Sequence, residues 1–532
     1  MRLIIRNSSI VVEGYKWGTC PRLERSFRMY DMVIHQEYYI GLYYDEEHSK
    51  LYLPRGIDIW FVENELGIKH EIDYDYDEYA ETKDFMIRFM PRDDVQKTTL
   101  RFMIGEGEYS DNKYMSQLSV NLNTGKGKTY VSIATLVYER KRSIIITYSN
   151  GWLAQWKKCI MEYTNAKGSD IYQISGSPSI DMILSGKSMH SDHSVYLITH
   201  STIKSYATAH GWDKITKLFK TLKIGFKFYD EAHLNFANMS MIDFFTNTFR
   251  TYYITATPAR SSDEENRIYQ LYLKNIPGIS LFNKEEDPHT KYIAMMYNSM
   301  PNPYDISGMK NAYGLDINKY CNWLVYKDTF HYMFRVTIDL IIGMIKDGGK
   351  VLFFIHTNEA ITIVKSWLEE EYPEFRGMIG VYSSLSDNKS AELKYRIILT
   401  TIKSAGAAVD INGLKAAVIL ADPFKSKVNA RQILGRTRAD DTYLIELVDL
   451  GFYQIKKWYY NKLPTYNKYA METKDVFLRS NELMEKAQDI IDWREWKGNA
   501  FKYNKDHGLC IRINEEYDSS PKECVKFHKY IL

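Results

Sequence analysis

The sequence lacks the features that mark several common classes of protein. Its five cysteines are scattered along 532 residues and include no Cys-x-x-Cys pair, which argues against a zinc site or a disulfide framework and favours a reducing compartment. No apolar run reaches the length of a membrane span, and residues 1–6 are too short and too soon interrupted to be a signal peptide. We therefore expect a cytoplasmic protein without a membrane partner.

An excess of charge of one sign is also missing. Lys and Arg together number 69 and Asp and Glu 67, so the formal net charge is +2. No overall basic field indicates nucleic-acid binding, and any such surface must be local. Hydrophobic residues make up 45% and charged residues 26%, as is ordinary for a globular protein, and the length predicts three or four domains.

The most informative segment that is present is rich in glycine and lysine: Asn123-Thr124-Gly125-Lys126-Gly127-Lys128-Thr129. Apolar residues precede it and a helix-like run, residues 130–137, follows it. The backbone N–H groups of such a turn and the N-terminus of the next helix bind phosphates. Lys128 would contact the β- and γ-phosphates and Thr129 would bind Mg²⁺. The alternative is a lysine-rich surface turn, since Leu122 occupies the position of the first glycine in the strictest pattern.

A pair of carboxylates follows a second strand-like run. Residues 223–229 are mainly apolar and lead into Asp230-Glu231-Ala232-His233. Asp230 is a candidate ligand for the Mg²⁺ that bridges nucleotide phosphates. Glu231 is a candidate general base that activates the attacking water. The alternative interpretation is an acidic loop that caps the next helix.

Strand-like runs alternate with helical stretches through most of the chain. The first block has such runs at 142–148, 194–199, 223–229 and 252–255, and a second block, without its own phosphate loop, has them at 350–355, 379–384, 396–401 and 416–420. This alternation predicts doubly wound parallel α/β sheets, whose ligands bind at the carboxyl ends of the strands. Prolines and Gly308 interrupt residues 281–320, which we interpret as a connector.

Six segments resemble motifs of superfamily 2 helicases and translocases, and they follow one another along the chain in the order that the family has. Residues 124–129, 230–233 and 255–258 resemble motifs I, II and III, with a DEAH-box-like second motif. Trp152-Leu-Ala-Gln155 resembles motif Ia, and residues 403–411 and 432–439 resemble motifs V and VI. Within the superfamily, the small N-terminal part and the short spacers resemble UvsW-type phage DNA helicases.

The resemblance implies an ATP hydrolase that uses ATP and Mg²⁺ and whose two RecA-like domains close on ATP and open after hydrolysis. It implies adenine binding by Gln96, whose amide can bond both edges of the base. It also implies phosphate binding by the loop from Thr124 to Thr129, coupling through Asp410, and contact of Arg436 with the γ-phosphate. Arg438 is the candidate second arginine, one residue from the family position, which holds Ala439. The candidate contacts with nucleic acid, all at strand ends, are Thr199, His200, Ser383 and Thr401.

We predict four parts in the chain. Residues 1–90 form a small α+β accessory domain that binds DNA or protein, residues 91–285 and 286–450 form the two tandem RecA-like domains, and residues 451–532 form a helical extension. Within the extension, residues 454–462 interleave lysines with aromatic residues. Such a pattern suits either a stacking platform for single strands or a helix packed on the second domain.

The predicted activity is ATP-driven movement on single-stranded or branched DNA, in replication, recombination or repair, and in the host cytoplasm if the gene belongs to a phage. Contacts with phosphates rather than bases would make binding weaken steeply with salt. Two alternatives stay open, an RNA-dependent ATPase of the same architecture and a nucleotide-switched clamp that never unwinds. The motor subunit of a restriction-type complex would need a partner, because the chain shows no nuclease or methyltransferase motif.

Overall fold

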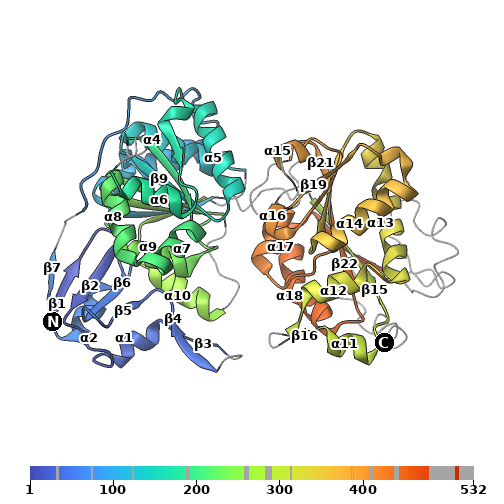
Figure 1. Cartoon of the computed structure of the whole chain (residues 1–532), viewed down its shortest axis with the longest axis horizontal. Helices are drawn as coiled ribbons and strands as arrows, with labels where there is room; N and C mark the ends of the chain where they lie inside the picture. Colours follow the sequence, from blue (N-terminus) through green and yellow to red (C-terminus); the bar gives the residue numbers. More distant parts are fainter. Residues whose placement is uncertain are drawn as a thin grey trace. The chain divides into compact units, whose positions relative to one another are not determined.

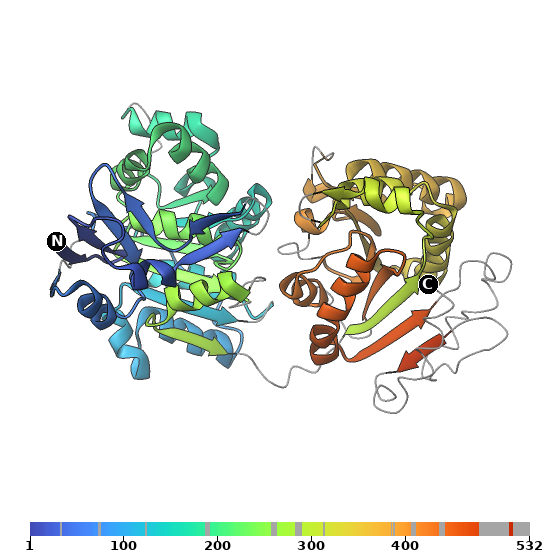
Figure 2. The same cartoon turned by 90° about the horizontal axis from the view of Figure 1, so that it is seen from below.

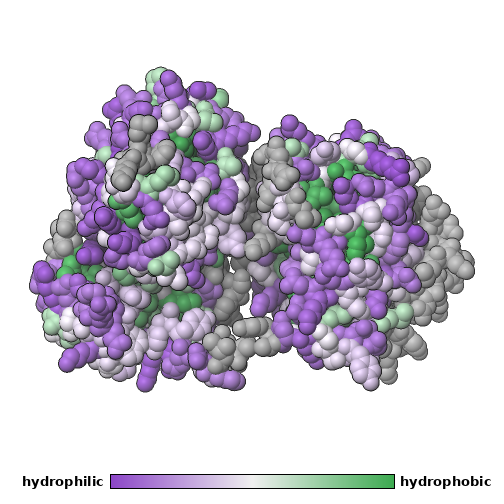
Figure 3. Space-filling view, in the orientation of Figure 1, coloured by the Kyte–Doolittle hydropathy of each residue, from purple (hydrophilic) through white to green (hydrophobic). Residues whose placement is uncertain are grey.

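The computed structural model divides the chain into two compact units, Met1–Lys284 and Glu285–Leu532, which are described separately below (Figure 1). The structure describes residues 1–31, 35–72, 76–122, 125–186, 192–256, 263–281, 290–311, 314–384, 386, 389–405, 411–435, 442–477 and 510–513. Among these residues, no helix combines the length and the hydrophobicity that crossing a bilayer requires. Hydrophilic side chains cover most of the face drawn in Figure 3.

A small α+β module opens the first unit. Its five-stranded sheet has the order β5-β6-β2-β1-β7, in which β1 is antiparallel to β2 and parallel to β7. The strands are β1 (Arg2–Ile5), β2 (Ser9–Glu13), β5 (Tyr43–Asp45), β6 (Lys50–Pro54) and β7 (His70–Ile72), with helices α1 (Pro21–Ser26) and α2 (Ile59–Leu66) and a hairpin of β3 (Arg28–Asp31) and β4 (Gln36–Tyr39). Apolar side chains of this module share one core with the helices on the neighbouring face of the larger sheet.

The larger sheet of the first unit is entirely parallel, with the order β10-β11-β9-β12-β13-β8-β14. Its strands are β8 (Gln117–Leu122), β9 (Ser143–Thr147), β10 (Ile171–Gln173), β11 (Val195–Thr199), β12 (Phe226–Asp230), β13 (Arg250–Thr255) and β14 (Gly278–Leu281). Its helices are α3 (Asp94–Ile104), α4 (Lys128–Glu139), α5 (Asn150–Tyr163), α6 (Gly176–Leu184), α7 (His200–His210), α8 (Trp212–Leu222), α9 (Phe236–Phe245) and α10 (Asp263–Leu273).

Alternate residues of these strands enter two different cores. In β9, Ile145 packs with the side chains of α3, α4 and α5, whereas Ile144 and Ile146 pack with those of α6 to α10. Successive strand side chains point to opposite faces, so a sheet covered on both faces needs apolar residues at nearly every position. The uninterrupted β-branched run of β9 meets that need. The N-terminal module packs against α9 and α10, on the side of these helices that faces away from the sheet (Figures 1 and 2).

The second unit contains an eight-stranded sheet with the order β19-β20-β18-β21-β22-β15-β23-β24, parallel except for β24. The strands are β15 (Thr290–Tyr297), β18 (Lys350–Ile355), β19 (Ile379–Tyr382), β20 (Ile397–Thr400), β21 (Leu414–Ala421), β22 (Thr442–Asp449), β23 (Glu472–Phe477) and β24 (Cys510–Ile513). The helices are α11 (Pro303–Gly308), α12 (Ile317–Leu324), α13 (Asp328–Lys346), α14 (Asn358–Glu371), α15 (Lys389–Glu392), α16 (Ile402–Ala405), α17 (Lys427–Leu434) and α18 (Tyr453–Tyr469). A two-stranded sheet of β16 (Lys310–Asn311) and β17 (Gly314–Leu315) follows α11.

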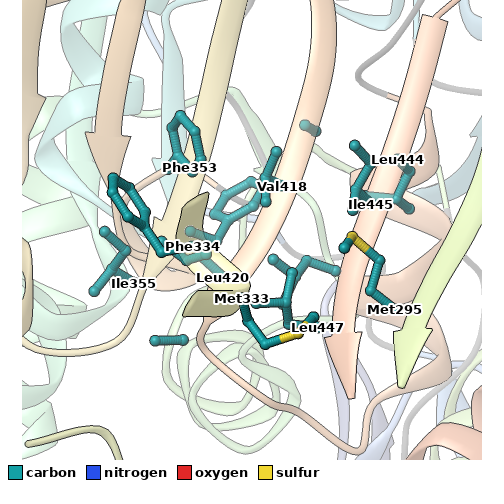
Figure 4. Close-up of a cluster of buried hydrophobic side chains, with 14 of the residues drawn as sticks. Met295, Met333, Phe334, Phe353, Ile355, Val418, Leu420, Leu444, Ile445 and Leu447 are labelled. Carbon is teal, nitrogen blue, oxygen red and sulfur yellow. The ribbon is translucent and has the colours of Figure 1, made fainter. Parts of the chain in front are cut away.

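Large side chains fill the core between this sheet and its helices. Met333 and Phe334 of α13 pack against Phe353 and Val418 of the central strands (Figure 4). The flexible side chain of Met295 on β15 belongs to the same buried cluster. The predicted fold class, two tandem doubly wound sheets with a small α+β N-terminal module, is confirmed.

Two segments differ from the predictions. The interpretation of residues 281–320 as a connector was wrong for β15, which pairs with β22 and β23 inside the sheet. Its prolines flank the strand rather than interrupt it, and the Ala294-Met-Met296 centre carries little β-propensity. The expected C-terminal helix is present as α18, which the strands β23 and β24 then follow.

Candidate nucleotide-binding site

The glycine-rich turn leads from β8 into α4. Gly125 and Gly127 both have φ of 86°, a left-handed conformation that costs glycine little. Gly127 caps α4, and its carbonyl accepts the first helical hydrogen bond, from the N–H of Val131 (3.0 Å). The N–H groups of the first turn of α4 are therefore available to an anion at the helix N-terminus. Asn123 and Thr124 lie outside the described residues.

Gln96 holds this turn from behind. Asp93 caps α3 by accepting the N–H of Gln96 (2.9 Å), and Oε1 of Gln96 accepts the N–H of Arg92 (2.9 Å). Nε2 of Gln96 donates to the carbonyl of Lys126 (3.5 Å), and a Cβ added to Gly127 would lie 2.2 Å from the same nitrogen. The amide therefore contacts the backbone of the turn directly, and adenine binding by Gln96 stays a prediction.

Lys128 faces the carboxylate of Glu231. Nζ lies 3.2 Å from Oε1 of Glu231, and the two side chains are 11% and 9% exposed. Nζ also donates to the carbonyl of Leu122 (3.5 Å). Burial tends to raise the pKa of Glu231, but the nearby charges of Lys128 and His233 outweigh it, so the pKa lies below its ordinary value. Glu231 is therefore ionised at neutral pH, as a general base must be.

Asp230 ends β12 beside Glu231. Burial and the charge of Glu231 raise the pKa of Asp230 to about 6. The indole N–H of Trp156, from α5, donates to Oδ2 of Asp230 (2.7 Å). A divalent cation would offset the repulsion between two adjacent carboxylates. Mg²⁺ is usually held by one or two carboxylates and the substrate phosphates, and the oxygen donors of Asp230 and Thr129 fit that habit. The described residues contain no cluster of three or more metal-ligating side chains.

Motif II and motif III are joined by hydrogen bonds across neighbouring strands. Asp230 of β12 pairs with Ile254 of β13. Oε2 of Glu231 accepts the N–H of Ala256 (3.3 Å) and the hydroxyl of Thr255 (3.4 Å). That hydroxyl also lies 2.7 Å from Nδ1 of His233. Glu231 itself has a φ of 51°, which is unfavourable for a residue other than glycine, so these bonds stabilise a strained position.

The four residues that we predict to contact nucleic acid lie at strand ends, but in the structure they are buried or form hydrogen bonds within the protein. Thr199 caps α7 by accepting the N–H of Thr202 (3.1 Å) and is 2% exposed. His200 is equally buried and stacks on Tyr229, and burial lowers its pKa to about 3. Ser383 is fully buried, while the partly exposed Thr401 accepts the N–H of Ser404 (3.0 Å). Burial weighs against direct contact for the first three, and the assignment stays a prediction.

Several predicted residues fall outside the described part of the chain. They are Thr124, Asp410, Arg436 and Arg438. Trp156, His233 and Thr255 are brought to the site without having been assigned a role from the sequence. His233 and Thr255 lie within the motifs and could have been weighed, whereas Trp156 lies 74 residues before Asp230 and only the fold brings the two together.

Comparison with known proteins gives a consistent result. Residues 90–260 match the family described as "Type III restriction enzyme, res subunit". No curated protein sequence matches. Among solved structures, a variant of S. cerevisiae Dbp5 bound to RNA and ADP BeF3 is 14% identical, with a TM-score of 0.50 over 76% of this chain and 91% of that chain. S. cerevisiae Dbp5 bound to the same ligands is 13% identical, with a TM-score of 0.48 over 74% of this chain and 91% of that chain. T4 UvsW is 13% identical, with a TM-score of 0.34 over 90% of this chain and 100% of that chain.

At 14% identity the likeness to Dbp5 shows the fold alone. The family match covers the phosphate loop and motif II, and the second parallel sheet supplies the other RecA-like domain. Residues 90–260 therefore resemble the domain of this family, and the two tandem sheets have the RecA-like fold.

Proposed function

We propose that the protein is an ATP-dependent DNA helicase or translocase that acts on single-stranded or branched DNA without reading its sequence. The observation that carries the proposal is the contact of Lys128 with Glu231 (3.2 Å), with Asp230 beside them at the end of β12. These three side chains lie together at one strand edge, and we assign phosphate binding to Lys128, metal binding to Asp230 and the role of general base to Glu231. Phosphoryl transfer depends on such positioning and on the stabilisation of charge.

In the proposed mechanism, the γ-phosphate of ATP attracts Lys128 away from Glu231. The turn from Thr124 to Thr129 binds the phosphates, because the free N–H groups at the N-terminus of α4 attract an anion. Glu231, released from its counterion, then accepts a proton from the attacking water. Its bonds to Ala256 and Thr255 keep the carboxylate in place during this exchange.

Mg²⁺, when bound, neutralises the charge that develops on the phosphates, and Asp230 and Thr129 are the residues of this chain that would hold it. The remaining assignments rest on the resemblance of the motifs. We assign adenine binding to Gln96, contact with the γ-phosphate to Arg436 and Arg438, and coupling between nucleotide and nucleic acid to Asp410. DEAH-box-like and UvsW-type membership are part of the same proposal.

DNA is the proposed substrate because the matching family is named for a restriction enzyme, and restriction acts on DNA. A second candidate is an RNA-dependent ATPase, since the Dbp5 structures with this fold hold RNA. Both substrates offer the same phosphate backbone to a protein that does not read bases. In either case the logarithm of the binding constant should fall linearly with the logarithm of the salt concentration.

The test is steady-state ATP hydrolysis without nucleic acid and with single-stranded DNA, duplex DNA, branched DNA or RNA. Stimulation by single-stranded or branched DNA supports the proposal, and stimulation by RNA alone supports the second candidate. Lys128→Ala should abolish hydrolysis. The matched control is Lys97→Ala, because Lys97 is an exposed lysine of the neighbouring helix α3 and should not be needed.

Strand-displacement assays complete the test. Hydrolysis without displacement of a labelled strand and without movement along DNA would leave a nucleotide-switched clamp. No hydrolysis under any condition would overturn the proposal.

A further inference from the structure

Helix α5 contributes an indole to the nucleotide site. Nε1 of Trp156 donates to Oδ2 of Asp230 at 2.7 Å, the length of a strong hydrogen bond to a carboxylate. Trp156 is 3% exposed and packs in the same core cluster as Leu153 and Ile160 of its own helix. Because the indole N–H is a donor only, the bond fixes one oxygen and the orientation of the carboxylate. Asp230 is thus positioned by a residue of another element.

The opposite face of α5 is open to solvent. Gly151, Ala154, Gln155 and Lys158 are exposed, whereas Trp152, Leu153, Trp156 and Ile160 face the core. The first half of the helix, residues 150–158, includes the half-buried Lys157 and the exposed Lys158 and no acidic residue, whereas its last turn carries the exposed Glu162. The first half of the exposed face therefore suits the phosphates of a polynucleotide better than an acidic partner.

The helix begins at the edge of the sheet where Asp230 lies. Strand β9 runs into α5 and pairs in parallel with β12, so that Ile146 of β9 is opposite Tyr229, the residue before Asp230. One side of α5 thus meets the solvent and the other meets the carboxylate, with a single side chain between them. A shift of the helix must move the indole, because a tightly packed core transmits displacement rather than absorbing it.

We propose that Trp156 is a positioning residue that couples a polynucleotide strand on the exposed face of α5 to metal binding by Asp230. The proposal rests on the proposed function and deepens it, because it names the contact through which the nucleic acid would act on hydrolysis. By linkage, the strand should tighten Mg²⁺ binding by the same factor as Mg²⁺ tightens strand binding. If Trp156 were only structural, removing its N–H would leave this coupling unchanged.

The test uses the full chain and two matched variants. Trp156→Phe keeps an aromatic ring in the core and removes the N–H donor. Trp152→Phe makes the same change one turn earlier on the same buried face, where the ring lies against Tyr148. Binding of a labelled single-stranded oligonucleotide is measured by fluorescence anisotropy with a non-hydrolysable ATP analogue, over a range of Mg²⁺ concentrations. Hydrolysis is then measured over the same range.

In the wild type and in Trp152→Phe, saturating Mg²⁺ should tighten oligonucleotide binding roughly tenfold, a typical size for coupling between two sites. In Trp156→Phe that factor should fall to about two or less, because the linking hydrogen bond is lost. The Mg²⁺ concentration for half-maximal hydrolysis should rise in Trp156→Phe by a larger factor than the maximal rate falls. Equal coupling factors in the two variants would overturn the inference.

A measurement on the wild type covers the case in which Trp156→Phe does not fold. Mg²⁺ with the ATP analogue, without nucleic acid, should slow amide hydrogen exchange in α5, and unchanged exchange there would overturn the inference. Failure of the proposed function is distinguishable, because it would show as wild-type hydrolysis that no nucleic acid stimulates. Stimulated wild-type hydrolysis with identical tryptophan variants would remove the role of Trp156 alone.

Discussion

In the first unit, the carboxyl ends of the strands hold an ion pair that, under the proposed function, a phosphate separates; in the second, the described residues at the same edge include a carboxylate bonded to its neighbours. Lys128 and Glu231 form an ion pair beside Asp230 in the first unit. In the second, the imidazole of His356 lies 2.7 Å from Asp422, whose other oxygen accepts the N–H of Ile402 (2.8 Å). Under the proposed function the first is a reactive edge, whereas Asp422 in the second has a structural role.

The two units are more alike in their buried polar groups. Each contains a fully buried lysine–carboxylate pair surrounded by tyrosine hydroxyls. In the first, Asp243 pairs with Lys227 (2.6 Å) and accepts the hydroxyls of Tyr229, Tyr253 and Tyr272. In the second, Glu446 pairs with Lys462 and accepts the hydroxyls of Tyr292 and Tyr466. The first network joins α9 to β12 and β13, the strands that precede motifs II and III, whereas the second joins α18 to β22.

The largest effect should come from removing the base at the reactive edge. Glu231→Gln is expected to lower the rate of ATP hydrolysis by roughly 10²- to 10⁴-fold, the usual contribution of a general base. Binding of an ATP analogue should persist, because Lys128 loses only its counterion. Steady-state hydrolysis and equilibrium binding measure the two effects.

The matching change in the second unit is Asp422→Asn. It should alter the rate without nucleic acid less than about threefold, because the side chain holds His356 and Ile402 in place and takes no part in the chemistry. An equal loss in both variants would show that the two edges do not differ in the way described.

The next largest effect should come from the buried ion pairs. Lys462→Met leaves Glu446 charged with two hydroxyl donors, whereas Lys227→Met leaves Asp243 with three. Breaking a buried pair from one side costs about 3–5 kcal/mol of unfolding free energy, and we expect Lys462→Met in that range and Lys227→Met below it. Calorimetric unfolding transitions of the two variants measure the order. The reverse order would mean that tyrosine donors do not compensate for the missing lysine.

Substituting one threonine in each unit compares the two strand ends that precede a helix. Thr199→Val removes the cap of α7 in the first unit and should cost about 1 kcal/mol of stability, with no change in affinity for an oligonucleotide. Thr401→Val in the second unit alters a partly exposed strand end, and under the proposed function it should weaken oligonucleotide binding a few-fold. Anisotropy titrations separate the two. Weaker binding by Thr199→Val at unchanged stability would support the predicted contact of Thr199 with nucleic acid.

Short local patterns in the sequence were enough to predict which segments meet at the strand edge of the first unit. The phosphate loop and Asp230-Glu231 are short segments in which neighbouring residues share one job, and the structure brings Lys128 and Glu231 together. The alternation of apolar runs likewise predicted both parallel sheets. The roles assigned to these site residues stay predictions.

Long-range contacts could not be predicted in this way. The bond between Trp156 and Asp230 depends on how α5 packs, which no spacing encodes. Lys227 alternates with Phe226 and Phe228, a pattern that places it on a solvent face in an isolated sheet, yet helices cover both faces here and the lysine is fully buried. Lys462, within the predicted basic and aromatic segment, is buried for the same reason, because α18 packs on β22.

The smallest expected effect concerns the acid sensitivity of the first unit, and it follows from the burial of His200. Its pKa is about 3 in the folded protein, against an ordinary value of about 6.5 once unfolded. The unfolded chain therefore takes up a proton as the pH falls below 6.5 while the folded chain does not. Stability is lost on acidification in that window, by about 1 kcal/mol between pH 7.5 and 5.5.

Substituting His200 isolates this term from the others in the same unit. The raised pKa of Asp230, about 6, acts in the opposite direction, because there the folded form binds the proton first. His200→Phe keeps a ring against Tyr229 and removes a side chain whose Nδ1 has no hydrogen-bond partner among the described residues. Relative to the wild type, this variant should lose about 1 kcal/mol less between pH 7.5 and 5.5, measured by denaturant unfolding at each pH. An unchanged difference would mean that His200 is protonated or exposed in solution, which would support the predicted contact of His200 with nucleic acid.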